Sequence, residues 1–185
     1  MKAVLISIQP KWCELIASGE KTVEVRKTKP KLETPFKVYI YCTKGRGDCL
    51  WRWGGVWYDT QFPNERPNRL DGKVIGEFVC DTFITDKTFG HDALFNAAAC
   101  LSDADAASYC LNKEMYGWHI SDLVIYDKPR ELSEFYTVIE NADCEKCRYY
   151  DTPCENEPCN QCQGGRKYLT RPPQSWCYVE SEGAK

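Results

Sequence analysis

The chain has 185 residues, of which 43% are hydrophobic, and it carries a net charge of −3 at pH 7. This length and composition predict one domain with a packed core and room for a small appendage, and they exclude a disordered chain. No apolar run approaches the roughly 20 residues that span a bilayer, and the short N-terminal apolar stretch has no secretory cleavage site. We therefore expect a cytoplasmic protein with no membrane association.

The charge is distributed unevenly along the chain. Residues 1–52 contain eleven Lys and Arg against five Asp and Glu, a net charge of +6, so the remainder carries −9. A basic N-terminal third is typical of an anion-binding face, and equally of a solvated surface rich in lysine. The charge count does not separate these two interpretations.

The N-terminal third predicts a strand, a helix and a second strand. Residues 2–8 are rich in Val, Leu and Ile, as in a buried strand. Pro10 suits the first turn of a helix, and Gly19 suits its C-terminal end. Residues 22–26 then alternate with a period of two, so Val23 and Val25 should face the core while Thr22, Glu24 and Arg26 share the opposite face.

The remaining elements are short and do not repeat. We expect strands at 36–42, 73–80, 116–125, 132–138 and 174–180, and a helix at 101–113 capped by Ser102 or Asp103. Gly76 marks a bulge or a close approach within its strand. Residues 44–72 have no clear period and predict a long loop of the kind that is often functional. Several short strands with two or three short helices predict an α+β fold, a small mixed β-barrel with helices at its ends.

Two Cys-x-x-Cys pairs lie near the C-terminus, and eleven residues separate them. The pairs are Cys144 with Cys147 and Cys159 with Cys162. Four thiolates at this spacing form a tetrahedral zinc site, which would be structural because no coordination position stays open. Two redox dithiols or unligated thiols are the alternative interpretation.

The cysteine pairs also set the expected domain boundaries. A segment over 143–165 is too polar to build its own core, and it predicts a metal-stapled knuckle or ribbon inserted into the barrel of residues 1–142 and 166–185. Cys154 and Cys177 remain outside this ligand set; Cys154 could take the place of Cys159, or Cys154 and Cys177 could pair under oxidation. Most of the other cysteines lie in apolar stretches and are expected to pack as core residues.

The segment around Lys21, Glu24 and Arg26 is the candidate functional site. A carboxylate flanked by two cations stays ionised, orients both of them and can accept hydrogen bonds from a base edge. Further cations on this part of the chain could contact phosphates, and they are Lys11, Lys27, Lys29 and Lys44. Tryptophans could stack bases. Trp12 is more readily interpreted as a core residue, whereas the loop residues Trp51, Trp53 and Trp57 fit base stacking and core packing about equally. The alternative is that the charged pairs are surface pairs worth little.

The run Ser18-Gly19-Glu20-Lys21-Thr22-Val23-Glu24-Val25-Arg26, with Ile8-Gln9-Pro10-Lys11 before it, resembles the signature of the ASCH domain family. Gly76-Glu77-Phe78, Tyr116-Gly117-Trp118-His119 and the closing segment 171–179 add to the likeness, which includes phage and prophage members with a Cys-rich insertion. The resemblance implies a PUA-like β-barrel that binds RNA in a basic cleft formed by Lys11, Lys21, Thr22, Glu24, Arg26, Lys27 and Lys44. Nothing in the sequence indicates a protein partner.

The resemblance also implies an enzyme as the alternative function. Some small family members resemble amidohydrolases that act on acetylated cytidine with a lysine, a threonine and a glutamate. Lys21 matches the lysine and Glu114 is a counterpart of the glutamate, but Glu24 stands where the threonine would fall, with Thr22 displaced along the strand. This departure weakens the hydrolase assignment. Other members are ribonucleases, for which Lys21 and a nearby Tyr or Ser would serve, whereas His119, inside a strand, is expected to be a satisfied core residue.

Overall fold

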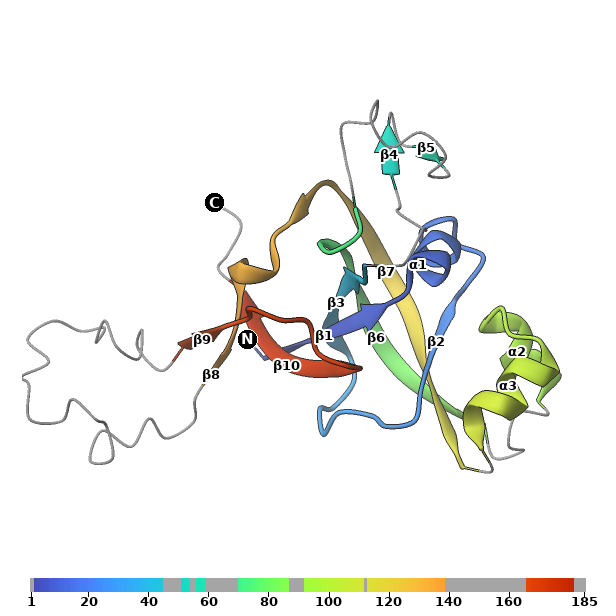
Figure 1. Ribbon diagram of the computed structural model, residues 1–185. Coiled ribbons are helices and arrows are strands. Elements are labelled where there is room, and N and C mark those ends of the chain that lie inside the picture. The colour runs from blue at the N-terminus through green and yellow to red at the C-terminus, as the bar shows by residue number, and fades with distance from the viewer. Residues whose placement is uncertain are drawn as a thin grey trace, which may run out of the picture.

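The computed structural model describes residues 2–44, 51–53, 56–58, 70–86, 92–111, 113–138 and 166–181, with the backbone alone at 51–53, 56–58, 86, 138 and 181 (Figure 1). Its elements are β1 (Ala3–Ile8), α1 (Pro10–Ala17), β2 (Val23–Arg26), β3 (Phe36–Cys42), β4 (Trp51–Trp53), β5 (Val56–Tyr58), β6 (Val74–Asp86), α2 (Ala93–Ala98), α3 (Asp103–Cys110), β7 (Met115–Arg130), the 3-10 helix η2 (Leu132–Glu134), β8 (Phe135–Val138), β9 (Arg166–Tyr168) and β10 (Trp176–Ser181). None of the described helices is long and apolar enough to cross a membrane.

Eight strands form one mixed sheet in the order β2-β7-β6-β3-β1-β10-β8-β9. β1 and β3 are parallel, and the other neighbours in this sheet are antiparallel. Within the described chain the end strands β2 and β9 do not pair with each other. The α+β class is therefore confirmed, but the sheet is open where a closed barrel was predicted. The four-residue β2 is an end strand of this sheet, and its partner is β7.

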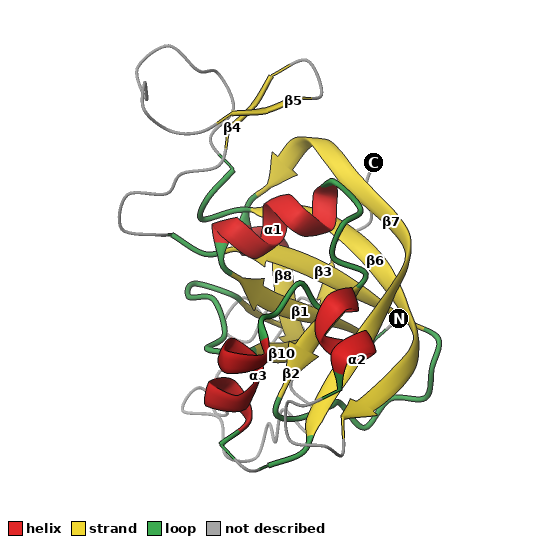
Figure 2. Ribbon diagram, turned by 90° about the vertical axis from the view of Figure 1, so that its right-hand side faces the viewer, coloured by secondary structure: helices red, strands yellow, loops and turns green. Residues whose placement is uncertain are grey.

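The sheet separates two apolar clusters that matter for the site. The main core holds Trp118 and Phe78 among the strands, with Ile16 of α1 packed against them. A smaller core lies beneath α2 and α3, and it buries Val23 and Val25 of β2. Figure 2 shows the two helices beside β2. The predicted inward orientation of Val23 and Val25 is thus confirmed. Glu24 points to the other side, which is not open solvent: its side chain is 4% exposed.

Three local features that the sequence predicted are present in the structure. Gly19 has φ +81°, the left-handed conformation expected after the helix end. A Cβ at Gly76 would clash with the carbonyl oxygen of Val124, and the β6–β7 ladder shifts its register beside it, so the expected close approach is confirmed. Ser102 caps α3 by accepting a hydrogen bond from the Asp105 amide at 3.1 Å.

Several elements differ from the prediction. α2 and the three-residue β9 were not expected, and β4 pairs with β5 inside the segment predicted as a loop. β6 and β7 run well beyond the predicted ranges, and their ladder continues through three register shifts. His119 is not a core residue: its side chain is 37% exposed, and its Nδ1 lies 2.7 Å from Oδ1 of Asp81. Cys13, Cys42, Cys80 and Cys110 are buried as expected, whereas Cys100 is half-buried.

Candidate functional site

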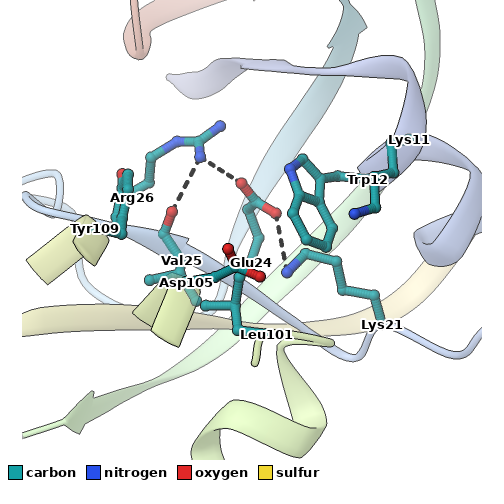
Figure 3. A pocket seen from close by; sticks show the side chains of 9 residues that line it. All are labelled: Lys11, Trp12, Lys21, Glu24, Val25, Arg26, Leu101, Asp105 and Tyr109. Atoms are coloured by element: carbon teal, nitrogen blue, oxygen red, sulfur yellow. Dashed lines mark hydrogen bonds and ion pairs between the residues drawn. The ribbon is translucent and has the colours of Figure 1, made fainter. Parts of the chain in front are cut away.

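An open pocket of about 230 Å³ lies between α1, β2 and α3 (Figure 3). It is lined by Lys11, Trp12, Lys21, Glu24, Val25, Arg26, Leu101, Asp105 and Tyr109. Three cations and two carboxylates among these residues leave the lining with a net charge of +1. Figure 3 shows Trp12 and Lys11 toward one end, Arg26 and Tyr109 toward the other, and Glu24 between them.

Local structure explains how the sequence brings the pocket residues together. Pro10 is the first residue of α1, so Lys11 and Trp12 lie in its first turn. After the helix the chain turns at Gly19, and the Lys21 amide donates to the carbonyl of Leu15 at 2.9 Å. The alternation of β2 then directs Glu24 and Arg26 to the same side.

Lys21 is a buried cation, with 3% of its side chain exposed. Its Nζ donates to the carbonyl oxygen of Ala99 at 2.5 Å and lies 3.6 Å from Oε2 of Glu24. The same ammonium lies 5.0 Å from the centre of the Trp12 ring. Burial lowers the pKa of Lys21, and the neighbouring Glu24 carboxylate opposes that effect.

Glu24 is held from its other side by Arg26. Nη1 of Arg26 contacts Oε1 of Glu24 and donates to the carbonyl of Val25 at 3.0 Å. Nη2 donates to the carbonyl of Ser7 at 2.7 Å. Nε of Arg26 is buried and has no hydrogen-bond partner among the described residues. One carboxylate therefore fixes two cations, and the guanidinium keeps an unused donor.

The two ends of the pocket carry aromatic rings. Nζ of Lys11, an exposed residue, lies 4.7 Å from the centre of the Trp12 ring. Tyr109, on α3, is 37% exposed. Asp105, one turn earlier on the same helix, accepts a hydrogen bond from the Ser102 hydroxyl at 2.7 Å. Trp12 is half-buried: it packs against the main core as expected and also lines the pocket.

The structure brings together some of the predicted site residues and separates others. Lys11, Lys21, Glu24 and Arg26 all line the pocket, whereas four further candidates do not line its described part. Lys27 lies outside, 4.9 Å above the Tyr109 ring; Thr22 and Lys44 are exposed; and Glu114 accepts a hydrogen bond from the Tyr116 hydroxyl at 3.3 Å.

Sequence reasoning missed the contribution of α3 and of the residue Leu101 before it to the pocket. Leu101, Asp105 and Tyr109 are some 80 residues from Lys21 along the chain and carry no motif of their own. Their spacing of four residues, on one face of the predicted helix, was the one available indication that they act together.

Other predicted residues lie outside the described part of the chain. This applies to the four cysteines of the predicted zinc site and to the whole insertion 143–165. The side chains of Trp51, Trp53 and Trp57 are likewise not described. Within the ranges that the structure describes, no three or more His, Cys, Asp or Glu side chains gather as a metal site.

Residues 6–87 match the ASCH domain family model. This segment runs from β1 to the end of β6, so it includes the pocket residues of α1 and β2. No curated protein matches the chain significantly.

Solved structures of an ASCH protein share the fold. The crystal structure of ASCH from Zymomonas mobilis is 17% identical, with a TM-score of 0.56 over 96% of this chain and 87% of that chain. A variant of that protein with serine replaced by alanine gives the same identity and TM-score over 96% and 88%. A tyrosine-to-phenylalanine variant is 20% identical, with a TM-score of 0.51 over 71% and 77%. At this level of identity the likeness establishes the ASCH fold.

Proposed function

We propose that the pocket binds one nucleotide of a single-stranded RNA. The observation that carries the proposal is the buried group of Lys21, Glu24 and Arg26 beside the ring of Trp12. Burying one acid with two bases leaves an excess positive charge in a place that water screens weakly. A ligand that brings a negative charge and a flat ring satisfies both features.

The size of the pocket favours a small part of the polymer. A volume of about 230 Å³ lies below the roughly 300–1,000 Å³ typical of sites that enclose drug-sized ligands. One base or one phosphate group fits such a space, with the rest of the nucleotide at the open side. A base stacking on Trp12 would displace the Lys11 ammonium, which is exposed and can then move to a phosphate.

The charged group is suited to hydrogen bonding with a base edge. Because Glu24 holds both cations in place, their remaining donors are oriented before a ligand arrives. The guanidinium of Arg26 and the ammonium of Lys21, which both line the pocket, are such donors. They match carbonyl and ring-nitrogen acceptors of a base, and Asp105 at the rim adds an acceptor for an amino group.

The comparisons support the same class of ligand. The segment 6–87 that matches the ASCH domain contains the motif from which the pocket is built, and ASCH domains are associated with RNA binding or a related activity. We also propose that the chain resembles the phage and prophage ASCH proteins that carry a Cys-rich insertion.

Binding of a fluorescein-labelled oligouridylate hexamer, followed by anisotropy, tests the proposal. Trp12→Ala should weaken binding by about 1–3 kcal/mol, because one stacked base is lost. Lys11→Ala should reduce the slope of log K against log salt by about 0.7, the value for one phosphate contact to a single strand.

Lys128→Ala is the matched control for both variants. Lys128 is exposed at the far end of β7 and should leave both quantities unchanged. The pocket would be refuted as the site if the wild type does not bind the hexamer. Equal binding by the wild type, Trp12→Ala, Lys11→Ala and Lys128→Ala would also refute it.

A nucleoside-processing enzyme or ribonuclease is the second candidate, and the lowered pKa of the buried Lys21 favours it. Tyr109 lines the same pocket, but no serine or threonine is among the described lining residues. Incubating the wild type with N4-acetylcytidine and with labelled RNA, followed by chromatography and gel analysis, decides between the two. If the wild type turns over either substrate and Trp12→Ala or Tyr109→Phe reduces the rate, the enzyme function replaces the binding proposal. If neither substrate is turned over, this second candidate is removed.

We further propose that Cys144, Cys147, Cys159 and Cys162 bind one structural zinc ion. The support is the spacing of the two pairs and the closed, all-thiolate ligand set that they offer. With no open position the ion would staple the insertion and take no part in chemistry at the pocket. Metal analysis of the purified chain tests this proposal.

A further inference from the structure

A row of lysines and aromatic rings continues beyond the pocket. Nζ of Lys27 lies 4.9 Å from the centre of the Tyr109 ring. Nζ of Lys29 lies 5.4 Å from the Phe83 ring and 5.5 Å from the Tyr116 ring. We call these five residues, Lys27, Lys29, Phe83, Tyr109 and Tyr116, the outer strip.

The outer strip is continuous with the pocket at two points. Tyr109 lines the pocket and also carries Lys27 over its ring. Arg26 lines the pocket, and Tyr116 is its direct partner in the β2–β7 ladder. Directly opposed side chains of an antiparallel pair lie about 5 Å apart on the same face. A ligand that leaves the pocket past Arg26 therefore meets the outer strip immediately.

The lysines of the outer strip are exposed, whereas the backbone that carries them is held in place. Lys27 and Lys29 are exposed, and the rings of Phe83 and Tyr116 are half-buried. Between the two lysines, the Thr28 hydroxyl accepts a hydrogen bond from Trp176 Nε1 at 3.0 Å. Two residues further on, the Lys31 amide donates to the Tyr178 hydroxyl at 2.7 Å. This segment is thus attached to β10 at two places, which hold the backbone of Lys27 and Lys29 in position.

We propose that a single-stranded RNA extends from the pocket onto the outer strip, with its next phosphates on Lys27 and Lys29 and its next base on Tyr109 or Tyr116. This inference rests on the proposed function. Charge complementarity and continuity with the pocket select the ligand, since a polyanion with accessible base faces can use both the lysines and the rings. A duplex buries its base faces and could use the lysines alone. The Tyr116 hydroxyl of the strip donates a hydrogen bond to Glu114 at 3.3 Å.

Comparing uridine 5′-monophosphate with an oligouridylate hexamer tests the outer strip separately from the pocket. The hexamer should bind at least about fivefold more tightly, because one additional stacked base contributes a factor of about 5 or more. The double variant Lys27→Ala/Lys29→Ala should leave the monophosphate affinity unchanged. It should weaken hexamer binding about 10- to 25-fold at 100 mM salt, since two phosphate contacts change the slope of log K against log salt by about 1.4.

Each outcome bears on one of the two ideas. Equal affinities of hexamer and monophosphate in the wild type would overturn the outer strip and leave the pocket standing. If Lys128→Ala weakens hexamer binding as much as the double variant does, the outer strip is also overturned. The lysines would then only attract a polyanion without forming a specific site. Hexamer binding that the double variant loses and Trp12→Ala retains would overturn the pocket and support the strip. Thermal melting of each variant confirms that the exposed substitutions leave the fold intact.

Discussion

Replacing Glu24 by glutamine removes the negative charge on which the buried group of the pocket depends. The side chains of Glu24, Lys21 and Arg26 are 4%, 3% and 13% exposed, so neither cation can turn to water to replace the lost partner. Removing one member of a buried ion pair costs about 3–5 kcal/mol, because the remaining charge stays desolvated. The surviving hydrogen bonds from Lys21 to Ala99 and from Arg26 to Ser7 favour the lower end, about 3 kcal/mol.

The assay is thermal unfolding as a function of pH. For a domain of this size 1 kcal/mol corresponds to about 2–4 °C, so Glu24→Gln should melt about 6–12 °C below the wild type at pH 7. The pKa of Lys21 is lowered in the folded protein, so the unfolded chain binds more protons between the two pKa values and stability rises with pH there. Without Glu24, which raises this pKa, the rise should begin at a lower pH in the variant.

Two comparisons isolate the buried charge as the cause. Glu20→Gln is the matched control: Glu20 is exposed and bonded to Ser18, and its replacement should change stability by less than about 0.5 kcal/mol. The double variant Lys21→Met/Glu24→Gln should melt above Glu24→Gln, because it no longer buries an unpaired ammonium. Equal melting temperatures for Glu24→Gln and Glu20→Gln, or a double variant less stable than the single one, would refute the reasoning.

Three further predictions concern the scaffold. Gly76→Ala should lower the free energy of unfolding by about 1–3 kcal/mol, measured from the urea midpoint, because its Cβ would meet the backbone carbonyl of Val124. An unchanged midpoint would mean that β6 and β7 move apart at no cost to accommodate the methyl group. Ser102→Ala should cost about 1 kcal/mol in the same assay by removing the cap of α3, and a loss confined to helical circular dichroism with no change in midpoint would contradict it. Mass spectrometry should find about one zinc per chain in the wild type and none in Cys144→Ser/Cys159→Ser, and a metal-free wild type would remove the zinc proposal.

Local patterns in the sequence predicted the part of the site that is local in the chain. Lys21, Glu24 and Arg26 lie within six residues, and the period of two in β2 was sufficient to place Glu24 and Arg26 together. Thr22 shares that period but precedes the first residue of β2, so its side chain is exposed.

Contacts distant in sequence could not be predicted in this way. Asp105 and Tyr109 reach the pocket only because α2 and α3 pack on Val23 and Val25, and that packing depends on the unpredicted α2. Likewise the openness of the sheet depends on which strands pair at its ends. Strand pairing is a property of the whole fold, and strands as short as β9 have little period to detect.

The hydrogen bond from Lys21 to Ala99 has a consequence for genetic studies of this protein. Ala99 is the C-terminal cap of α2, and the neighbouring Ala98 carbonyl accepts from the Thr22 amide at 3.0 Å. The ammonium that faces the pocket is therefore also one of the fastenings between β2 and the helical layer. An allele that changes Lys21 alters ligand recognition and helix attachment together, and its phenotype reports on both. Separation-of-function alleles are better sought at Lys11 and Trp12, which face the pocket from α1 and hold no other segment in place by a described hydrogen bond.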